Sequence, residues 1–166
     1  MLPLQFNFMS LAHKHYLQQA IDLASQNVSS LQGGPYGAVI VKDARVIAAS
    51  GNCVTINKDP TAHAEIMAIR QACIALDNFQ LKGCTLYTSC EPCPMCLGAI
   101  YWARLEKVYF ACNRQQAAKA GFDDGFIYDE ISKDIDQRQI PMRQIDLTNA
   151  EKPFLDWNRQ NNKVCY

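Results

Sequence analysis

Three cysteines fall within seven residues, at Cys90, Cys93 and Cys96 in the stretch YTSCEPCPMCLGAI. Closely spaced thiols can form a disulfide, hold an iron–sulfur cluster or bind zinc. Cys93 and Cys96 are three residues apart where Pro92 opens a predicted helix, so their sulfur atoms lie on one face and can share a metal ion. The partial positive charge at the helix N-terminus also favours the thiolate form that zinc requires.

Cys90 does not belong to this pair. It precedes the helix-opening Pro92 at the end of a predicted strand, so it does not share the helical spacing. An iron–sulfur cluster would need a fourth thiolate, and the bacterial ferredoxin run ends in Cys-Pro, whereas positions 99 and 100 are Ala and Ile. We therefore expect Cys90 to be a buried thiol in the wall of the site.

Two further candidates lie in DPTAHAEIMAIR, where His63 and Glu65 occupy the first turn of another predicted helix. His63 would be the third protein ligand and leave the fourth tetrahedral position to water, which is the open arrangement of catalytic zinc. Bound zinc lowers the pKa of its water toward ~7, and Glu65 can take and relay the proton. Alone, Glu65 is explained as an exposed residue that favours the helix dipole. The combined pattern, H-x-E followed by P-C-x-x-C, is the signature of zinc deaminases.

The elements that position these residues alternate between strand and helix. Strands are predicted at residues 38–42, 45–50, 84–89, 106–112 and 142–148. Helices are predicted after Ser10, over residues 62–76, after Pro92 and over residues 150–162. We therefore expect an α/β fold, a three-layer α/β/α sandwich around a central mixed five-stranded sheet whose first two strands are antiparallel. No repeat or linker interrupts residues 1–166, so a single domain is expected.

The composition restricts the expected partners and location. Sixteen basic residues balance sixteen acidic ones, so the chain lacks the broad positive field of a nucleic-acid or membrane binder. The first ten residues do not resemble a secretory signal and no apolar run could span a bilayer, so we expect a cytoplasmic protein with no membrane partner. The remaining cysteines are expected to be core fillers or spectators, namely Cys53, Cys73, Cys84, Cys112 and Cys165. His13 and His15 are expected to be solvated.

Longer blocks carry a resemblance beyond the metal motif: GGPYGAVIVKD, NKDPTAHAEIMAIRQAC, LYTSCEPCPMCLGAIYWAR and AAKAGFDDGFIY. From about residue 33 to the last residue, the chain resembles the bacterial guanine deaminases of the cytidine-deaminase-like superfamily. The resemblance implies that superfamily's fold, one zinc ion per chain on His63, Cys93 and Cys96, and hydrolysis of guanine to xanthine and ammonia. A zinc-activated water would add to the amine-bearing ring carbon, with Glu65 as the proton shuttle.

The resemblance also assigns substrate-binding positions. Asn52 would hydrogen-bond the purine, and Asp124 would act with Glu65 in catalysis by orienting the amine and assisting its proton transfer. Tyr36 stands where an aromatic ring stacks on the base in relatives, and Ala64 is expected to contact the substrate. Simpler explanations are open for two of these residues, because Asn is common at turns and an Asp can cap a helix.

The C-terminal segment is a further candidate part of the site. The resemblance implies that Tyr166 folds over the pocket and that residues 150–166 close the active site. The alternative is that the chain end frays, as most chain ends do. Relatives also suggest a homodimer, which either exchanges this segment between its subunits or keeps it on its own subunit.

Two other functions compete with guanine deamination. The tRNA adenosine deaminases share a similar DPTAHAEIMA and P-C-x-M-C, but they must hold a phosphate backbone with basic residues. Residues 123–136 contain six acidic residues and a single base, Lys133, so we expect no nucleic-acid partner. A zinc-stabilised binding module without catalysis would have lost Glu65, which is present. The enzyme is therefore the favoured interpretation.

Overall fold

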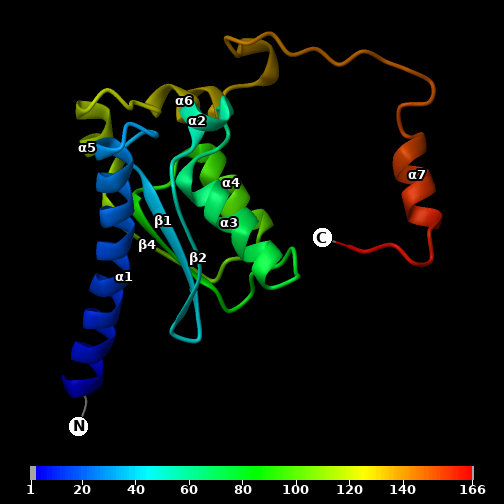
Figure 1. Cartoon of the computed structure of the whole chain (residues 1–166). Coiled ribbons are helices and arrows are strands. Elements are labelled where there is room, and N and C mark those ends of the chain that lie inside the picture. Colours follow the sequence, from blue (N-terminus) through cyan, green and yellow to red (C-terminus); the bar gives the residue numbers. More distant parts are fainter. Residues whose placement is uncertain (1–2, 166) are drawn as a thin grey trace. The chain divides into compact units, whose positions relative to one another are not determined.

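The computed structural model describes residues 3–165, with side chains from residue 11 onward. The chain is divided into two compact units, Met1–Asp124 and Gly125–Tyr166. The first unit holds a sheet in the order β2-β1-β3-β4 (Figure 1). Its strands are β1 (Gly37–Lys42), β2 (Arg45–Gly51), β3 (Thr85–Cys90) and β4 (Lys107–Cys112). β1 pairs antiparallel with both β2 and β3, and β3 pairs parallel with β4, so the predicted mixed sheet is confirmed.

The predicted fifth strand is wrong, and among the described residues the sheet has four strands. Residues 142–147 form no regular secondary structure and belong to the second unit. Their alternating apolar side chains remain exposed, with Ile145 at 73% and Leu147 at 65%. Alternation alone does not make a strand, because a strand also needs a neighbouring edge to satisfy its backbone N–H and C=O groups.

Helices cover both faces of the sheet in the first unit (Figure 1). Successive strand residues point to opposite faces, so Val39 faces one side and Ile40 the other. Val39 packs with Ala20 of α1 (Pro3–Ser29). Ile40 packs in a second cluster with residues of α3 (Ala64–Ala75) and α4 (Pro94–Trp102). The predicted helix–sheet–helix layering of the α/β fold is therefore present in this unit.

The first helix begins earlier than predicted, at Pro3, so Ser10 lies inside α1 and does not cap it. The prediction that His13 is solvated is wrong, because its side chain is partly buried. Its Nδ1 atom lies 2.8 Å from the hydroxyl oxygen of Tyr87, and its ring stacks on Tyr109 with the centroids 4.1 Å apart. His15 is exposed as predicted, because residues two apart on a helix point in different directions.

Short helices complete the two units. The first unit also contains α2 (Val54–Asn57) and α5 (Arg114–Lys119), and α5 begins with a capping box between Asn113 and Gln116. The second unit contains α6 (Gly125–Ser132), a 3-10 turn at Ile135–Gln137 and α7 (Lys152–Arg159). Within the described chain, every helix is too short or too polar to cross a membrane.

Candidate metal centre and active site

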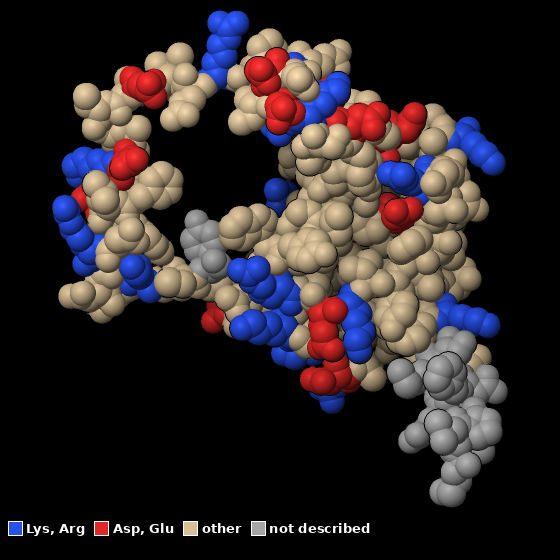
Figure 2. Space-filling view, turned by 180° about the vertical axis from the view of Figure 1, so that it is seen from behind, with Lys and Arg blue, Asp and Glu red and all other residues tan. Residues whose placement is uncertain are grey.

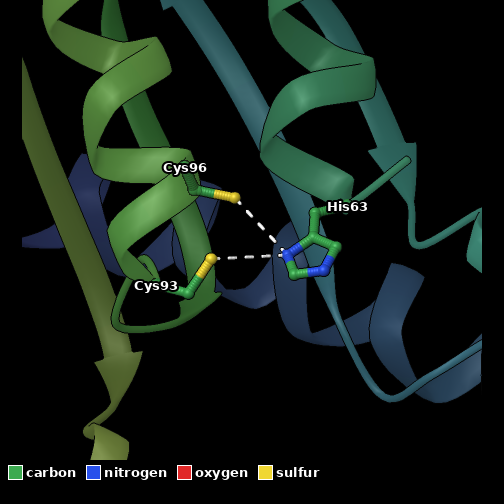
Figure 3. A group of neighbouring side chains, drawn as sticks. All are labelled: His63, Cys93 and Cys96. Atoms are coloured by element: carbon green, nitrogen blue, oxygen red, sulfur yellow. Dashed lines mark hydrogen bonds between the residues drawn. The ribbon is translucent and has the colours of Figure 1, made fainter. Parts of the chain in front are cut away.

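The three predicted metal ligands lie at the beginnings of two neighbouring helices. His63 is the N-cap of α3 and Cys93 is the N-cap of α4, and both have extended backbone conformations with ψ of 156° and 168°. Figure 3 shows the His63 ring facing the two cysteines. The Nδ1 atom of His63 is 3.5 Å from the sulfur of Cys93 and 3.5 Å from the sulfur of Cys96. The predicted convergence of these residues is confirmed, since their ligand atoms all lie within 4.8 Å of one another.

These distances fit a tetrahedral zinc site. With Zn–S bonds of about 2.3 Å and Zn–N bonds of about 2.0–2.1 Å, a tetrahedral angle places nitrogen and sulfur about 3.5 Å apart. One imidazole nitrogen and two sulfurs are also the donor types that zinc prefers. Within the described chain, the group of potential ligands contains these three residues and no fourth. The arrangement therefore suits an open, catalytic site rather than a closed structural one.

The two sulfurs differ in their affinity for a proton. The hydrogen bond from Cys96 lowers the pKa of the Cys93 thiol to about 4, and the hydrogen bond from His63 acts in the same direction. The hydrogen bond between Cys96 and Cys93, followed by burial, raises the pKa of the Cys96 thiol. A divalent cation at this position would stabilise the thiolate form of both.

Glu65 lies beside the metal ligands and is 4% exposed, which excludes the alternative of an exposed helix residue. It sits in the first turn of α3, two residues after His63. Burial raises the pKa of its carboxyl group, and the neighbouring Cys93 raises it further. The hydroxyl of the fully buried Thr88 donates a hydrogen bond of 3.4 Å to Glu65 Oε1. A buried carboxylate with a defined hydrogen-bond donor can exchange protons with a reacting group beside the metal.

Asn52 and Tyr36 are joined through their backbones. The backbone N–H of Asn52 donates to the Tyr36 carbonyl at 3.0 Å. The side-chain Oδ1 of Asn52 accepts a bond of 3.1 Å from the Val54 N–H, which fixes the orientation of the amide. The Tyr36 ring meets Phe122 edge to face, with centroids 5.3 Å apart. Burial raises the pKa of Tyr36, and Glu65 adds to this effect, which is consistent with a position near the site.

The other predicted residues have more varied positions. Asp124 is partly exposed, and burial followed by the charge of Cys93 raises the pKa of its carboxyl group. Ala64 is fully buried as the first residue of α3, and its backbone N–H has no acceptor within the helix. Cys90 is 6% exposed, as predicted, and burial raises the pKa of its thiol to about 11. Tyr166 lies outside the described residues.

Two residues near the site were not predicted from the sequence. The sequence predicts Thr88 only as part of a strand, although strand alternation places it on the same face as Leu86, toward α3. The sequence signal for Asn27 is weak, because it is one of several amide side chains in a helix that ends before QGGP. Both act through hydrogen bonds to residues distant in the sequence, which spacing does not reveal.

Comparison with known proteins agrees with this site. Residues 10–112 match the family model of the cytidine and deoxycytidylate deaminase zinc-binding region. Over 154 residues the chain is 54% identical to guanine deaminase from Bacillus subtilis (strain 168), covering 93% of this chain and 99% of the relative. The X-ray structure of guanine deaminase from Bacillus subtilis matches with a TM-score of 0.91, covering 93% of this chain and 98% of that one.

Other relatives match less of the chain. A tRNA-specific adenosine deaminase from Aquifex aeolicus (strain VF5) is 49% identical over 77 residues, 46% of this chain and 51% of the relative. A relative solved in complex with 8-azaguanine is 32% identical with a TM-score of 0.65, covering 68% of this chain and 65% of that one. The family model spans more than half of the chain and includes the His63–Cys96 region that forms the metal centre. The chain therefore belongs to the family of zinc-binding cytidine and deoxycytidylate deaminases.

Proposed function

We propose that this protein is a zinc-dependent guanine deaminase, which hydrolyses guanine to xanthine and ammonia. The observation that carries the proposal is the extent of the similarity to guanine deaminase, 54% identity over 93% of the chain. The match to tRNA-specific adenosine deaminase covers 46% of the chain. The geometry supports the same conclusion, because His63, Cys93 and Cys96 form an open ligand set beside the buried Glu65.

The substrate is held by groups around the metal centre. The Asn52 amide hydrogen-bonds the purine, and its fixed orientation reduces the entropy lost on binding. The Tyr36 ring stacks on the base, supported from the side by Phe122. Asp124 orients the exocyclic amine, and the backbone N–H of Ala64 contacts the ring at the start of α3.

Glu65 moves the protons of the reaction. His63, Cys93 and Cys96 hold the zinc ion, which when bound supplies a Lewis acid that lowers the pKa of water. The Glu65 carboxylate accepts a proton from the attacking water and delivers it to a ring nitrogen as the C–O bond forms. It then carries the proton of the added hydroxyl to the departing amine, so that the C–N bond breaks and ammonia leaves. Burial of Glu65 keeps bulk water away from this transfer.

We further propose that residues 150–166 close the active site of the single catalytic domain, with Tyr166 over the substrate, and that the protein is a homodimer. Apolar side chains support a subunit contact, since Phe154 is 72% exposed on α7, and Tyr101 and Trp102 are 70% and 64% exposed on α4. The segment is exchanged between subunits or retained by its own subunit. Light scattering measures the number of subunits. Removal of the last residues should lower kcat/KM for guanine while the melting temperature stays nearly unchanged.

Charge argues against a nucleic-acid substrate. Figure 2 shows Lys and Arg side chains in several separate places on this face, with acidic side chains between them. Sixteen basic and sixteen acidic residues leave no net positive charge to attract a phosphate backbone. Among the described residues, none of the eight cysteines is paired in a disulfide, which supports a reducing, cytoplasmic location.

An ammonia-release assay tests the proposed function. We expect release from guanine, about one zinc ion per chain by elemental analysis, and no release from an adenosine-containing tRNA stem-loop. Other free bases and nucleosides, added under the same conditions, define the substrate range. Release from the tRNA stem-loop without release from guanine would assign the chain to the RNA-acting branch instead. Stoichiometric zinc with no release from any substrate would favour a binding module.

A further inference from the structure

Asn27 is a buried amide near the end of α1 that joins two loops beside the candidate active site. It is 8% exposed. Its Nδ2 group donates a hydrogen bond of 2.6 Å to the Asn52 carbonyl and another of 3.1 Å to the Gly34 carbonyl. The first carbonyl belongs to a predicted substrate-binding residue, and the second lies two residues before another, Tyr36. One side chain of α1 therefore anchors both segments.

The surrounding backbone is packed closely against this amide. A Cβ atom added at Gly33 would lie 2.2 Å from the Asn52 carbonyl oxygen and 2.7 Å from Asn27 Nδ2. A Cβ atom added at Gly51 would lie 2.7 Å from Asn27 Oδ1. Both glycines thus permit an approach that a larger residue would prevent. The fit leaves Asn27 little freedom to change its rotamer or its partners.

The anchored segments are also bonded to each other, so displacement of one would be transmitted to the other. The Asn52 N–H donates to the Tyr36 carbonyl at 3.0 Å, and the Asn52 side chain is oriented by Val54. Loss of the donor would leave the buried Asn52 carbonyl unsatisfied, which is more costly than loss of a bond at the surface, whereas the part-buried Gly34 carbonyl would keep its bond from the Tyr36 N–H. The local backbone would then rearrange to recover hydrogen bonds, and the Asn52 amide would move with it.

We propose that Asn27 is a positioning residue for substrate binding: it holds the Asn52 and Tyr36 backbones so that the base meets a preformed site. This inference rests on the proposed guanine deaminase activity. Asn27 touches neither the metal ligands nor Glu65 in the hydrogen bonds that it forms. Its loss should therefore weaken binding of the base more than the chemical step.

Asn27→Asp is the most direct test, because it keeps the size and shape of the side chain but replaces the donor with an oxygen that faces two carbonyl oxygens. We expect the KM for guanine to rise by about tenfold or more, with kcat changed by less than about threefold and zinc content retained. The matched control is Gln26→Glu, which makes the same amide-to-carboxylate change at the adjacent, exposed position of α1 and should leave both constants unaltered.

Two measurements without turnover complete the test. Calorimetry with 8-azaguanine should show weaker binding to Asn27→Asp by a factor similar to the rise in KM. Hydrogen exchange should accelerate in residues 33–36 and 51–54 while α3 and β3 stay protected. If Asn27→Asp does not fold, Asn27→Ser, which retains one donor, should show a smaller shift of the same kind.

The outcomes separate this inference from the proposed function. An inactive wild-type protein would contradict the guanine deaminase proposal itself. An active wild type with an unchanged KM in the Asn27 variants would overturn the inference alone. A lower kcat or lost zinc with unchanged KM would also overturn it, because Asn27 would then support the fold generally rather than the binding segments.

Discussion

Thr88→Val removes the hydroxyl that orients Glu65 while preserving the shape of the side chain. The Thr88 hydroxyl donates to Glu65 Oε1 over 3.4 Å, and the two residues are 0% and 4% exposed. A hydrogen bond to a charged group contributes about 1.5–3 kcal/mol, and the long distance places this bond at the lower end of that range. If the whole contribution is expressed in the transition state, about 1.5 kcal/mol corresponds to an approximately tenfold lower kcat.

Steady-state kinetics with guanine measures this effect, and Thr88→Ser is the matched control. Serine keeps the hydroxyl but removes one buried methyl group, so it should lower the free energy of unfolding by about 1 kcal/mol while kcat stays within about threefold of wild type. The KM for guanine should be nearly unchanged in both variants, because Thr88 orients Glu65 and not the base. An unchanged kcat in Thr88→Val, or an equal loss in both variants, would refute the positioning of Glu65 by this bond.

Three further predictions concern other parts of the first unit. Glu65→Gln should retain zinc but lower kcat by at least about a hundredfold because it removes the proton shuttle, and elemental analysis with kinetics would show whether turnover survives. Cys90→Ser should leave the zinc content unaltered. In the wild type, burial raises the pKa of the Cys90 thiol to about 11, so at pH 8 this thiol should be alkylated far more slowly than the exposed Cys112. Mass spectrometry measures the two alkylation rates. Hydrogen bonds from Thr61 lower the pKa of the Asp59 carboxyl group. The ionised Asp59 therefore stabilises the folded state above about pH 4, and this contribution is lost as the pH falls through the lowered pKa. The melting temperature of Asp59→Asn should consequently fall less than that of wild type between pH 5 and pH 3, and parallel curves would contradict this.

The metal centre was predictable because it depends on local geometry. The three-residue spacing of Cys93 and Cys96 and the placement of His63 and Glu65 at the start of a helix are properties of short segments. The structure brings these segments together as predicted. The β-hairpin of β1 and β2 was predictable for the same reason, because two clearly patterned strands lie close together in the sequence. Asp43 and Ala44 form its turn, with φ of 48° and 61°.

The errors concern properties that depend on distant residues. The segment at 142–148 has the pattern of a strand, but no local signal states whether a sheet edge is available to it. The correct inference that His13 and His15 diverge did not reveal that His13 faces the sheet, where Tyr87 and Tyr109 contact it. Asn27 and Thr88 likewise act on residues 25 and 23 positions away, so their hydrogen bonds follow from the tertiary fold.

His63 and Cys93 each occupy a helix N-cap, yet neither side chain bonds a backbone N–H of its own helix. Ser, Thr, Asn or Asp usually supplies that bond, and its absence costs ~1 kcal/mol at a terminus. Because both cap positions are given to ligand residues, a bound cation would supply part of the stability that the first turns of α3 and α4 lack. Prolonged exposure to a chelator should accordingly fray these two helix starts while the sheet remains intact, so activity would disappear well before the protein melts.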